Sequence, residues 1–408
     1  MCKITQHNQT WVGNNEDSWR IDSKIWFRQG EAGKYGVCYV GHENMMPQGG
    51  MNRAGLVFDA FSIMPRPLKP GTDPNKITDP YAHIQQLMQT CATVEQVREF
   101  IRLHGRYYNN GMYLFVDKTG KYLVAEPDTC IIGTDPNYLL SNFCPSQTPD
   151  LGAVKISRYK RGQAYLALHA PDSGLAYTLA LMDTMHECRP KLGDGTTYTS
   201  LYNLNTGNIY LYFYHNYKQA AVFNLDAELA RGNHEITMSA LFAPNAEYEA
   251  FVNFITPFNN NYFMAWMLIA GAFAGFSSVY FTRTFVAAKR RNKAGQGVLS
   301  NASAGQWTGI VLAIANIVLC VFIYVLLTNK GMFYFPAPYR TGYSLFTDIM
   351  AFFPLLLLVL FPVLAYQTYK SMRQPGQKNL WVLVFALNTI AFALWLCLFV
   401  YWGFLAYW

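Results

Sequence analysis

The chain has 408 residues, enough for two domains, and a formal net charge of +7. The positive charge is concentrated near the C-terminus, because from residue 258 onward ten Lys or Arg residues stand against one acid, Asp348. The preceding part of the chain is therefore slightly acidic, which gives no reason to expect binding to nucleic acid.

The first 62 residues predict short strands, because Val, Tyr, Trp and Phe alternate there with Gly, Asn and Asp at turns. Trp26-Phe27 and residues 37–40 are the expected core strands. Residues 79–104 show helical spacing of apolar side chains with a break near Thr93, which predicts two helices.

Further along, residues 113–125 predict a hairpin. Residues 163–185 predict helix with an interruption at Pro171, and residues 198–223 predict two strands with a turn at 205–208. Strands, helices and strands in this order indicate an α+β domain.

The last part of the chain predicts an all-α membrane domain. It contains four windows without Lys, Arg, Asp or Glu, each with the about 20 residues that a helix needs to cross a bilayer. We place the four spans at about 262–284, 307–329, 346–369 and 379–406. The domains are then 1–250, a juxtamembrane linker at 251–260, and the membrane domain at 261–408.

Lys and Arg in the short loops predict the orientation of this domain. Loops 285–306 and 370–378 contain seven of them, whereas the loop between the second and third spans contains only Lys330 and Arg340. The first two loops are therefore expected in the cytoplasm, and the N-terminal domain and the C-terminus on the outside.

An outward domain needs a leader, yet residues 1–20 contain no apolar core of a signal peptide. We expect a leader that ends directly before Cys2; the alternative is a cytosolic domain and a misleading charge pattern.

Cys2 is a candidate nucleophile if it becomes the first residue, either by loss of Met1 or by cleavage of a leader. Its thiol, with an ordinary pKa of about 8.5, would then lie beside its own α-amine, with a pKa of about 7.7 to 8.0. The amine can accept the thiol proton, so nucleophile and base are on one residue. A cysteine after the initiator is often incidental, so the neighbouring residues must decide.

Those neighbours resemble a family. Cys2 followed by Gly13-Asn14-Asn15-Glu16-Asp17 resembles the opening of the N-terminal-nucleophile linear amide hydrolases, which include choloylglycine hydrolases, penicillin V acylases and acyl-coenzyme A:6-aminopenicillanate acyltransferases. The resemblance covers about residues 2–245 and continues in order through residues 48–56, 122–126, 141–143, 157–159, 199–204 and 223–225. It implies a four-layer αββα sandwich that hydrolyses a linear amide C–N bond without a cofactor.

The resemblance also implies roles for four catalytic residues. Cys2 would attack the amide carbonyl, and Asp17 would hold the ammonium or the thiol in position. Asn142 would donate an N–H to the oxyanion, and the charge of Arg158 would favour the thiolate. The alternatives are a turn aspartate, a turn asparagine and a surface ion pair.

Two departures from the family bear on the substrate. Asn14 stands where many members have Arg, and Arg20 is the candidate that would replace this charge. Residues 57–62 lack the Asn that bile-salt-type members use as a second oxyanion donor, so Ser62 or a backbone N–H would serve. Asn52 is a further candidate for the substrate or oxyanion site. The departures weaken a bile-salt assignment more than amide hydrolysis.

Metals and disulfides have little support in the sequence. The eight histidines lack the spacing of metal ligands and no Cys-x-x-Cys occurs, so no metal is expected. Five cysteines besides Cys2 precede the membrane spans, and an odd number favours free thiols over a disulfide framework.

The sequence thus predicts a membrane-tethered amidase that cleaves an N-acyl amine or N-acyl amino acid through a thioester. Its expected partners are a small-molecule N-acyl amide and membrane lipids; its oligomeric state is not predicted. The alternatives are acyl transfer through the same thioester and a catalytically inactive, outward-facing binding module.

A second hypothesis concerns the four spans. Small residues at 271–275 predict close helix packing, and Pro354 and Pro362 predict a kinked third span. A bundle of this shape would offer a lateral groove for an acyl chain; the alternative is a passive anchor.

Overall fold

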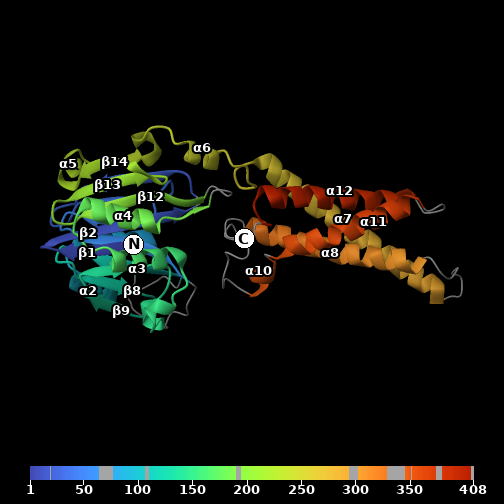
Figure 1. Cartoon of the computed structure of the whole chain (residues 1–408), viewed down its shortest axis with the longest axis horizontal. Coiled ribbons are helices and arrows are strands. Elements are labelled where there is room, and N and C mark those ends of the chain that lie inside the picture. The colour runs from blue at the N-terminus through green and yellow to red at the C-terminus, as the bar shows by residue number, and fades with distance from the viewer. Residues whose placement is uncertain are drawn as a thin grey trace. The chain divides into compact units, whose positions relative to one another are not determined.

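In the computed structural model the chain forms two compact units, Met1–Val252 and Asn253–Trp408 (Figure 1). The structure describes residues 1–18, 20–63, 77–105, 110–189, 194–293, 302–328, 345–350, 352–373 and 379–405. The loop residues Lys330, Arg340 and Lys378 lie outside the described residues, as do Trp19 and parts of both loops predicted to be cytoplasmic.

Two antiparallel sheets form the middle of the first unit. The first sheet has the spatial order β10 (Asn137–Leu139), β1 (Cys2–Gln6), β2 (Gln9–Ser18), β12 (Asp194–Asn203), β13 (Asn208–Phe213) and β14 (Asn216–Asn224), with β11 (Cys188–Arg189) paired to β12. The second has the order β15 (His234–Thr237), β3 (Ser23–Arg28), β4 (Val37–His42), β5 (Pro47–Asn52), β6 (Val57–Ser62), β7 (Gly111–Val116), β8 (Tyr122–Ala125) and β9 (Cys130–Gly133).

Helices cover the outer face of each sheet. Helices α1 (Pro80–Thr90) and α2 (Val94–His104) pack on the second sheet through one apolar cluster. Helices α3 (Ser157–Leu168) and α4 (Leu175–Met185) pack on the first sheet through another (Figure 1). A third cluster fills the space between the sheets. The predicted four-layer αββα sandwich is therefore confirmed.

The break predicted near Thr93 is confirmed, because capping residues separate the two helices. The Asp79 carboxylate accepts N–H groups at the start of α1. Thr93 and Gln96 form a capping box at the start of α2, which satisfies backbone N–H groups that have no partner inside the helix.

The structure differs from the sequence prediction in two places. Helix α3 begins at Ser157 rather than at 163, so Arg158 lies in its first turn. Residues 198–223 belong to three strands rather than two, because the chain turns again at Tyr214-His215. Both residues have positive φ, 46° and 61°. A turn without Gly or Pro has no sequence signal of the usual kind.

The remaining helices of the first unit are short. Helix α5 (Leu225–Ala230) follows β14, and α6 (Ala246–Val252) ends the unit. The side-chain amide of Asn245 donates to the carbonyl of Tyr214 at 3.1 Å, which holds the start of α6 against the turn between β13 and β14.

The second unit is helical. Its elements are α7 (Asn261–Lys293), α8 (Ala302–Thr328), α10 (Leu345–Met350), α11 (Phe353–Met372) and α12 (Asn379–Tyr401). Helices α7, α8, α11 and α12 are long and apolar enough to cross a membrane, as predicted. Helix α7 extends to Lys293, past the predicted loop boundary at 285.

The third span differs from its prediction because of a proline. Residues 345–350 form the separate helix α10, and α11 begins at Phe353 with Pro354 in its first turn. A proline there leaves no hydrogen bond unmade, since the first N–H groups of a helix have no partner inside it. The expectation that Pro354 kinks the span was therefore wrong; Pro362 does lie inside α11.

Polar side chains join three of the membrane helices. The Asn316 amide donates to Asn388 at 2.7 Å, and the Asn388 amide donates to Ser277 at 3.1 Å. All three are buried, so each bond satisfies a polar group that apolar surroundings would otherwise leave unpaired. These contacts tie α8, α12 and α7 together.

The segment of small residues at 271–275 packs against α8 at only one of its two glycines. Gly271 lies against α8: its carbonyl accepts the Cys320 thiol at 3.3 Å, and a Cβ there would lie 3.7 Å from Ile323. A Cβ at Gly275 would meet open space. Only the first glycine of the pair therefore brings the helix backbones close.

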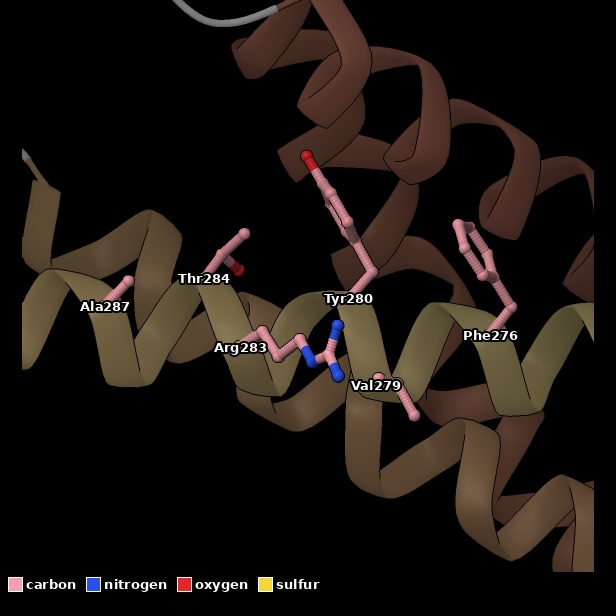
Figure 2. Close-up of a pocket in the computed structure, with 6 residues that line it drawn as sticks. All are labelled: Phe276, Val279, Tyr280, Arg283, Thr284 and Ala287. Carbon is pink, nitrogen blue, oxygen red and sulfur yellow. The ribbon is translucent and has the colours of Figure 1, made fainter.

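A pocket of about 350 Å³ lies along α7, and the groove hypothesis can be compared with it. It is lined by Phe276, Val279, Tyr280, Arg283, Thr284 and Ala287. Figure 2 shows that all six side chains project from the same helix, so the pocket is a groove on its surface rather than an enclosed cavity. A role of the spans in holding an acyl chain stays a prediction.

Candidate functional site

Cys2 lies at the start of β1, between β2 and β10. Its Cα is opposite Gly13 on one side and Leu139 on the other. The thiol is completely buried, in the cluster under α4, and is hydrogen-bonded by the backbone of Gly13. A Cβ on Gly13 would lie 2.7 Å from Met182 of α4, so a glycine lets this helix pack directly over β2 beside Cys2.

Met1 extends the pairing of β1 by one residue. Its ammonium donates to the carbonyl of Leu140 at 3.1 Å, and its carbonyl accepts from the N–H of Leu140 at 3.1 Å. Its side chain is buried between the two sheets. The nitrogen of Cys2 is here a peptide nitrogen, so the structure describes a form in which Cys2 has no amine of its own.

Burial shifts the pKa values of the Cys2 thiol and of the Met1 terminal amine. It raises the pKa of the Cys2 thiol to about 11, although the terminal amine and the Gly13 backbone oppose the shift. It lowers the pKa of the terminal amine, against the attraction of Asp59 and, to a smaller extent, Asp17. A buried amine is therefore neutral more often at neutral pH and can accept a proton.

Arg158 brings three of the predicted catalytic residues into one group. Its Nη1 lies 3.5 Å from a carboxylate oxygen of Asp17, and its Nη2 donates to Oδ1 of Asn142 at 2.5 Å. Its Nε donates to Ser141 at 3.2 Å. The side chains of Arg158 and Asp17 are 26% and 25% exposed, so the group is accessible from solvent at one side.

These contacts fix the orientation of the Asn142 amide. Because Arg158 occupies Oδ1, the NH₂ group must point away from the guanidinium, and Nδ2 donates one hydrogen to the carbonyl of Ser62 at 2.8 Å. An amide nitrogen carries two hydrogens. Asn142 thus has a second amide hydrogen beyond the one given to Ser62, and Ser62 joins the group through its backbone carbonyl.

Two further residues complete the group, and the sequence had not indicated them. Oδ1 of Asp17 accepts from the hydroxyl of Thr196 at 2.6 Å, and this hydroxyl accepts from the N–H of Glu187 at 3.0 Å. The Glu187 carboxylate lies 3.9 Å from Arg158. Since Thr196 lies 179 residues from Asp17, only the pairing of β12 with β2 brings the two together.

Two candidates lie elsewhere. Arg20 forms an ion pair with Glu43 at the surface, so it does not join the Arg158 group. Asn14 is buried in β2, and by strand alternation it faces the same side as Glu16, toward the second sheet, where Glu16 lies 3.6 Å from His42.

Asn52 is the last residue of strand β5, and its side chain bonds to the C-terminal end of helix α1. Its Nδ2 donates to the carbonyls of Met88 and Cys91 at 2.8 and 2.7 Å, and its Oδ1 accepts from Ala54 and Leu56 at 3.1 and 2.9 Å. These bonds use the whole amide, which is the arrangement of a structural residue.

Two buried carboxyl groups lie between the sheets. Burial raises the pKa of Asp59 in β6, and the Glu16 carboxyl raises it further, while the terminal amine opposes the shift. Burial also raises the pKa of Glu16, opposed by His42. Asp59 is the one charged residue of the apolar strand Val57–Ser62. A charged residue is rarely buried in such a strand, so the sequence alone could have indicated Asp59 as a candidate site residue.

Comparisons with solved structures find likenesses over the N-terminal part. A conjugated bile acid hydrolase variant from Clostridium perfringens is 16% identical, with 60% of this chain and 97% of that chain covered and a TM-score of 0.48. Penicillin V acylase from Agrobacterium tumefaciens is 14% identical, with 58% and 85% covered and a TM-score of 0.41. A Caenorhabditis elegans ortholog of N-acylethanolamine-hydrolyzing acid amidase is 10% identical, with 50% and 92% covered and a TM-score of 0.36.

No family model and no curated protein matches the chain.

We predict that Met1 controls the reactivity of Cys2. With a thiol pKa of about 11, fewer than about one Cys2 thiol in a thousand is ionised at pH 7.5. Chain synthesised with an inhibitor of methionine aminopeptidase should therefore resist iodoacetamide at Cys2, whereas chain that begins at Cys2 should react. Peptide mass mapping in the presence of a metal chelator measures both, with the exposed Cys188 as the internal control. Equal rates at Cys2 and Cys188 in the Met1 form would contradict the prediction.

We predict that Asn52→Ala lowers the free energy of unfolding by roughly 2–4 kcal/mol, because it leaves buried carbonyls and N–H groups without partners. Thermal or denaturant unfolding measures the loss. Asn44→Ala, at an exposed turn, should change it by less than about 0.5 kcal/mol. An oxyanion role for Asn52 would instead predict lost activity at unchanged stability.

Proposed function

We propose that the first unit is a cysteine amidase that hydrolyses the C–N bond of an N-acyl amine or N-acyl amino acid. The observation that carries the proposal is the group in which Arg158 joins Asp17 and Asn142, with Arg158 and Asp17 within electrostatic reach of the terminal amine. The mechanism requires that Met1 be absent, so that the amine belongs to Cys2.

In the proposed reaction the α-amine of Cys2 takes the thiol proton, and the thiolate attacks the amide carbonyl. The oxyanion that forms accepts the N–H of Asn142. The C–N bond then breaks, and the leaving amine takes the proton from the α-ammonium. A water molecule, deprotonated by the same amine, attacks the thioester and breaks its C–S bond, which releases the acid and restores the thiol.

Asp17 and Arg158 act in this scheme through charge and position. Asp17 stabilises the α-ammonium between the two proton transfers, and Thr196 and Arg158 hold its carboxylate in place. Arg158 also fixes the Asn142 amide and favours negative charge nearby.

The surroundings of Met1 support an apolar acyl group. The Met1 side chain is 5% exposed and packs in the apolar cluster between the sheets. Loss of Met1 would open apolar space next to the new N-terminus, which suits the acyl side of a substrate better than a charged amine.

We predict that chain beginning at Cys2 hydrolyses N-acyl amides and that Cys2→Ala lowers kcat/KM at least about 10³-fold. Asn142→Ala should cost about 10²- to 10³-fold. The measurement is release of the free amine from a series of N-acyl amino acids and N-acyl amines of increasing acyl length, with intact mass to establish the N-terminus. Cys144→Ala is the matched cysteine control. Full activity of Cys2→Ala, or equal activity with Met1 retained, would refute the mechanism.

The four membrane-crossing helices make this a membrane protein, and we propose that its catalytic unit faces outward. The charge of the loops supports this: Lys289 and Arg290 at the end of α7, and Lys370 and Arg373 at the end of α11, lie on the side proposed to be cytoplasmic.

We predict that a membrane-impermeant maleimide labels Lys218→Cys in intact cells, because Lys218 is exposed in β14 of the first unit. Lys289→Cys, at the end of α7, should be labelled only after the cells are lysed. Both substitutions are made in a background with Cys188→Ala and Cys397→Ala, which removes the two cysteines that are exposed in the described part of the chain. Labelling of Lys289→Cys but not of Lys218→Cys in intact cells would place the unit in the cytoplasm.

A further inference from the structure

Three side chains of the types that bind metals meet in the first unit, and none of them belongs to the Arg158, Asp17 and Asn142 group. Cys188 belongs to β11, His215 to the turn between β13 and β14, and Glu247 to α6. One ligand atom from each lies within 4.8 Å of the others. The three come from segments that are far apart in the sequence, so the fold alone assembles them.

The spacing of the atoms suits a tetrahedral ion. Nδ1 of His215 forms a long hydrogen bond of 3.4 Å with Oε2 of Glu247. Two nitrogen or oxygen ligands at about 2.0–2.1 Å from a tetrahedral zinc ion lie about 3.3–3.4 Å apart. The imidazole and the carboxylate therefore already have the separation that a shared ion imposes, and the thiol of Cys188 lies within 4.8 Å of both.

His215 is the buried member of the three. Its side chain is 7% exposed, and its ring is held in place by stacking on His186, with centroids 5.2 Å apart. Its Nδ1 faces Glu247, so the imidazole presents this nitrogen to the position that an ion would share with the carboxylate and the thiol.

We propose that Cys188, His215 and Glu247 bind one zinc ion, with water as the fourth ligand. A thiolate, an imidazole and a carboxylate are the ligand types that zinc takes in proteins. The thiolate and the carboxylate together neutralise its charge. The ion binds α6, the last helix of the unit, to the edge of the first sheet, where Asn245 already bonds to Tyr214.

The zinc site also adjoins the proposed active site. Glu187, which precedes Cys188, lies 3.9 Å from Arg158 and 3.3 Å from Arg161. A ligand bond at Cys188 thus restrains the segment whose carboxylate positions Arg158. Zinc binding itself does not depend on the proposed amidase activity, and its test requires no substrate.

The test uses the full-length chain purified in detergent, stripped with a chelator and then titrated with Zn²⁺. Elemental analysis should find about one zinc per chain, and Co²⁺ in its place should give the near-ultraviolet band of a thiolate ligand. Cys188→Ala should remove that band, and His215→Ala and Glu247→Gln should each weaken binding at least about tenfold. Cys144→Ala and His169→Ala, in the same unit, are the matched controls and should bind as the unaltered chain does.

Unfolding temperature provides the second measurement, because a metal that binds only the folded chain raises it. Zn²⁺ should raise the unfolding temperature of the unaltered chain and of the control variants, and leave that of Cys188→Ala unchanged. A stoichiometry near zero, or equal binding by Cys188→Ala and the unaltered chain, would overturn the proposal. Failure of the amidase assay with normal zinc binding would overturn only the proposed function.

Discussion

The pairing of β1 between β10 and β2 is the constraint on which the rest of the first unit depends. It places the beginning of the chain inside a sheet rather than at its edge, so the terminal amine is buried, which lowers its pKa. Burying an ammonium is costly unless opposite charges are near. Asp59 and Asp17 lie within electrostatic reach of the amine, and Glu16 lies beside Asp59. The acidic residues around the N-terminus thus follow from the position of the strand.

The candidate site is stabilised by ion pairs between Arg158 and two carboxylates, those of Asp17 and Glu187. Arg158 lies in the first turn of α3, where the helix dipole disfavours a positive charge. Asp17 and Glu187 compensate for it, and because each comes from a different strand region, the guanidinium links helix and sheet. Arg158 can therefore position Asp17 and Asn142 without touching a substrate. Its ion pair with Glu187 also connects the site to the segment that carries Cys188.

Much of the fold was predictable because its signals are local. Apolar periodicity indicated the helices, the Thr93 capping box separated α1 from α2, and the uncharged windows indicated the membrane helices. The failures have physical reasons. The turn at Tyr214-His215 uses non-glycine residues at positive φ, and Pro354 begins a helix instead of bending one. In the candidate site, the resemblance indicated Asp17, Asn142 and Arg158, whereas Thr196 and Glu187 had no signal because they meet Asp17 and Arg158 only across strands.

Local patterns in the sequence indicated most of the strands and helices, the membrane-crossing segments and the candidate nucleophile Cys2, because each depends on residues that are neighbours in the chain. Which polar groups meet depends on the fold of the whole unit. Arg158 reaches Asp17 across 141 positions of the chain, and Cys188, His215 and Glu247 are gathered from three segments. Such encounters depend on strand register and on how helices pack over a sheet. The pattern of apolar residues sets which face of an element is buried, but not which distant side chains the buried faces bring together.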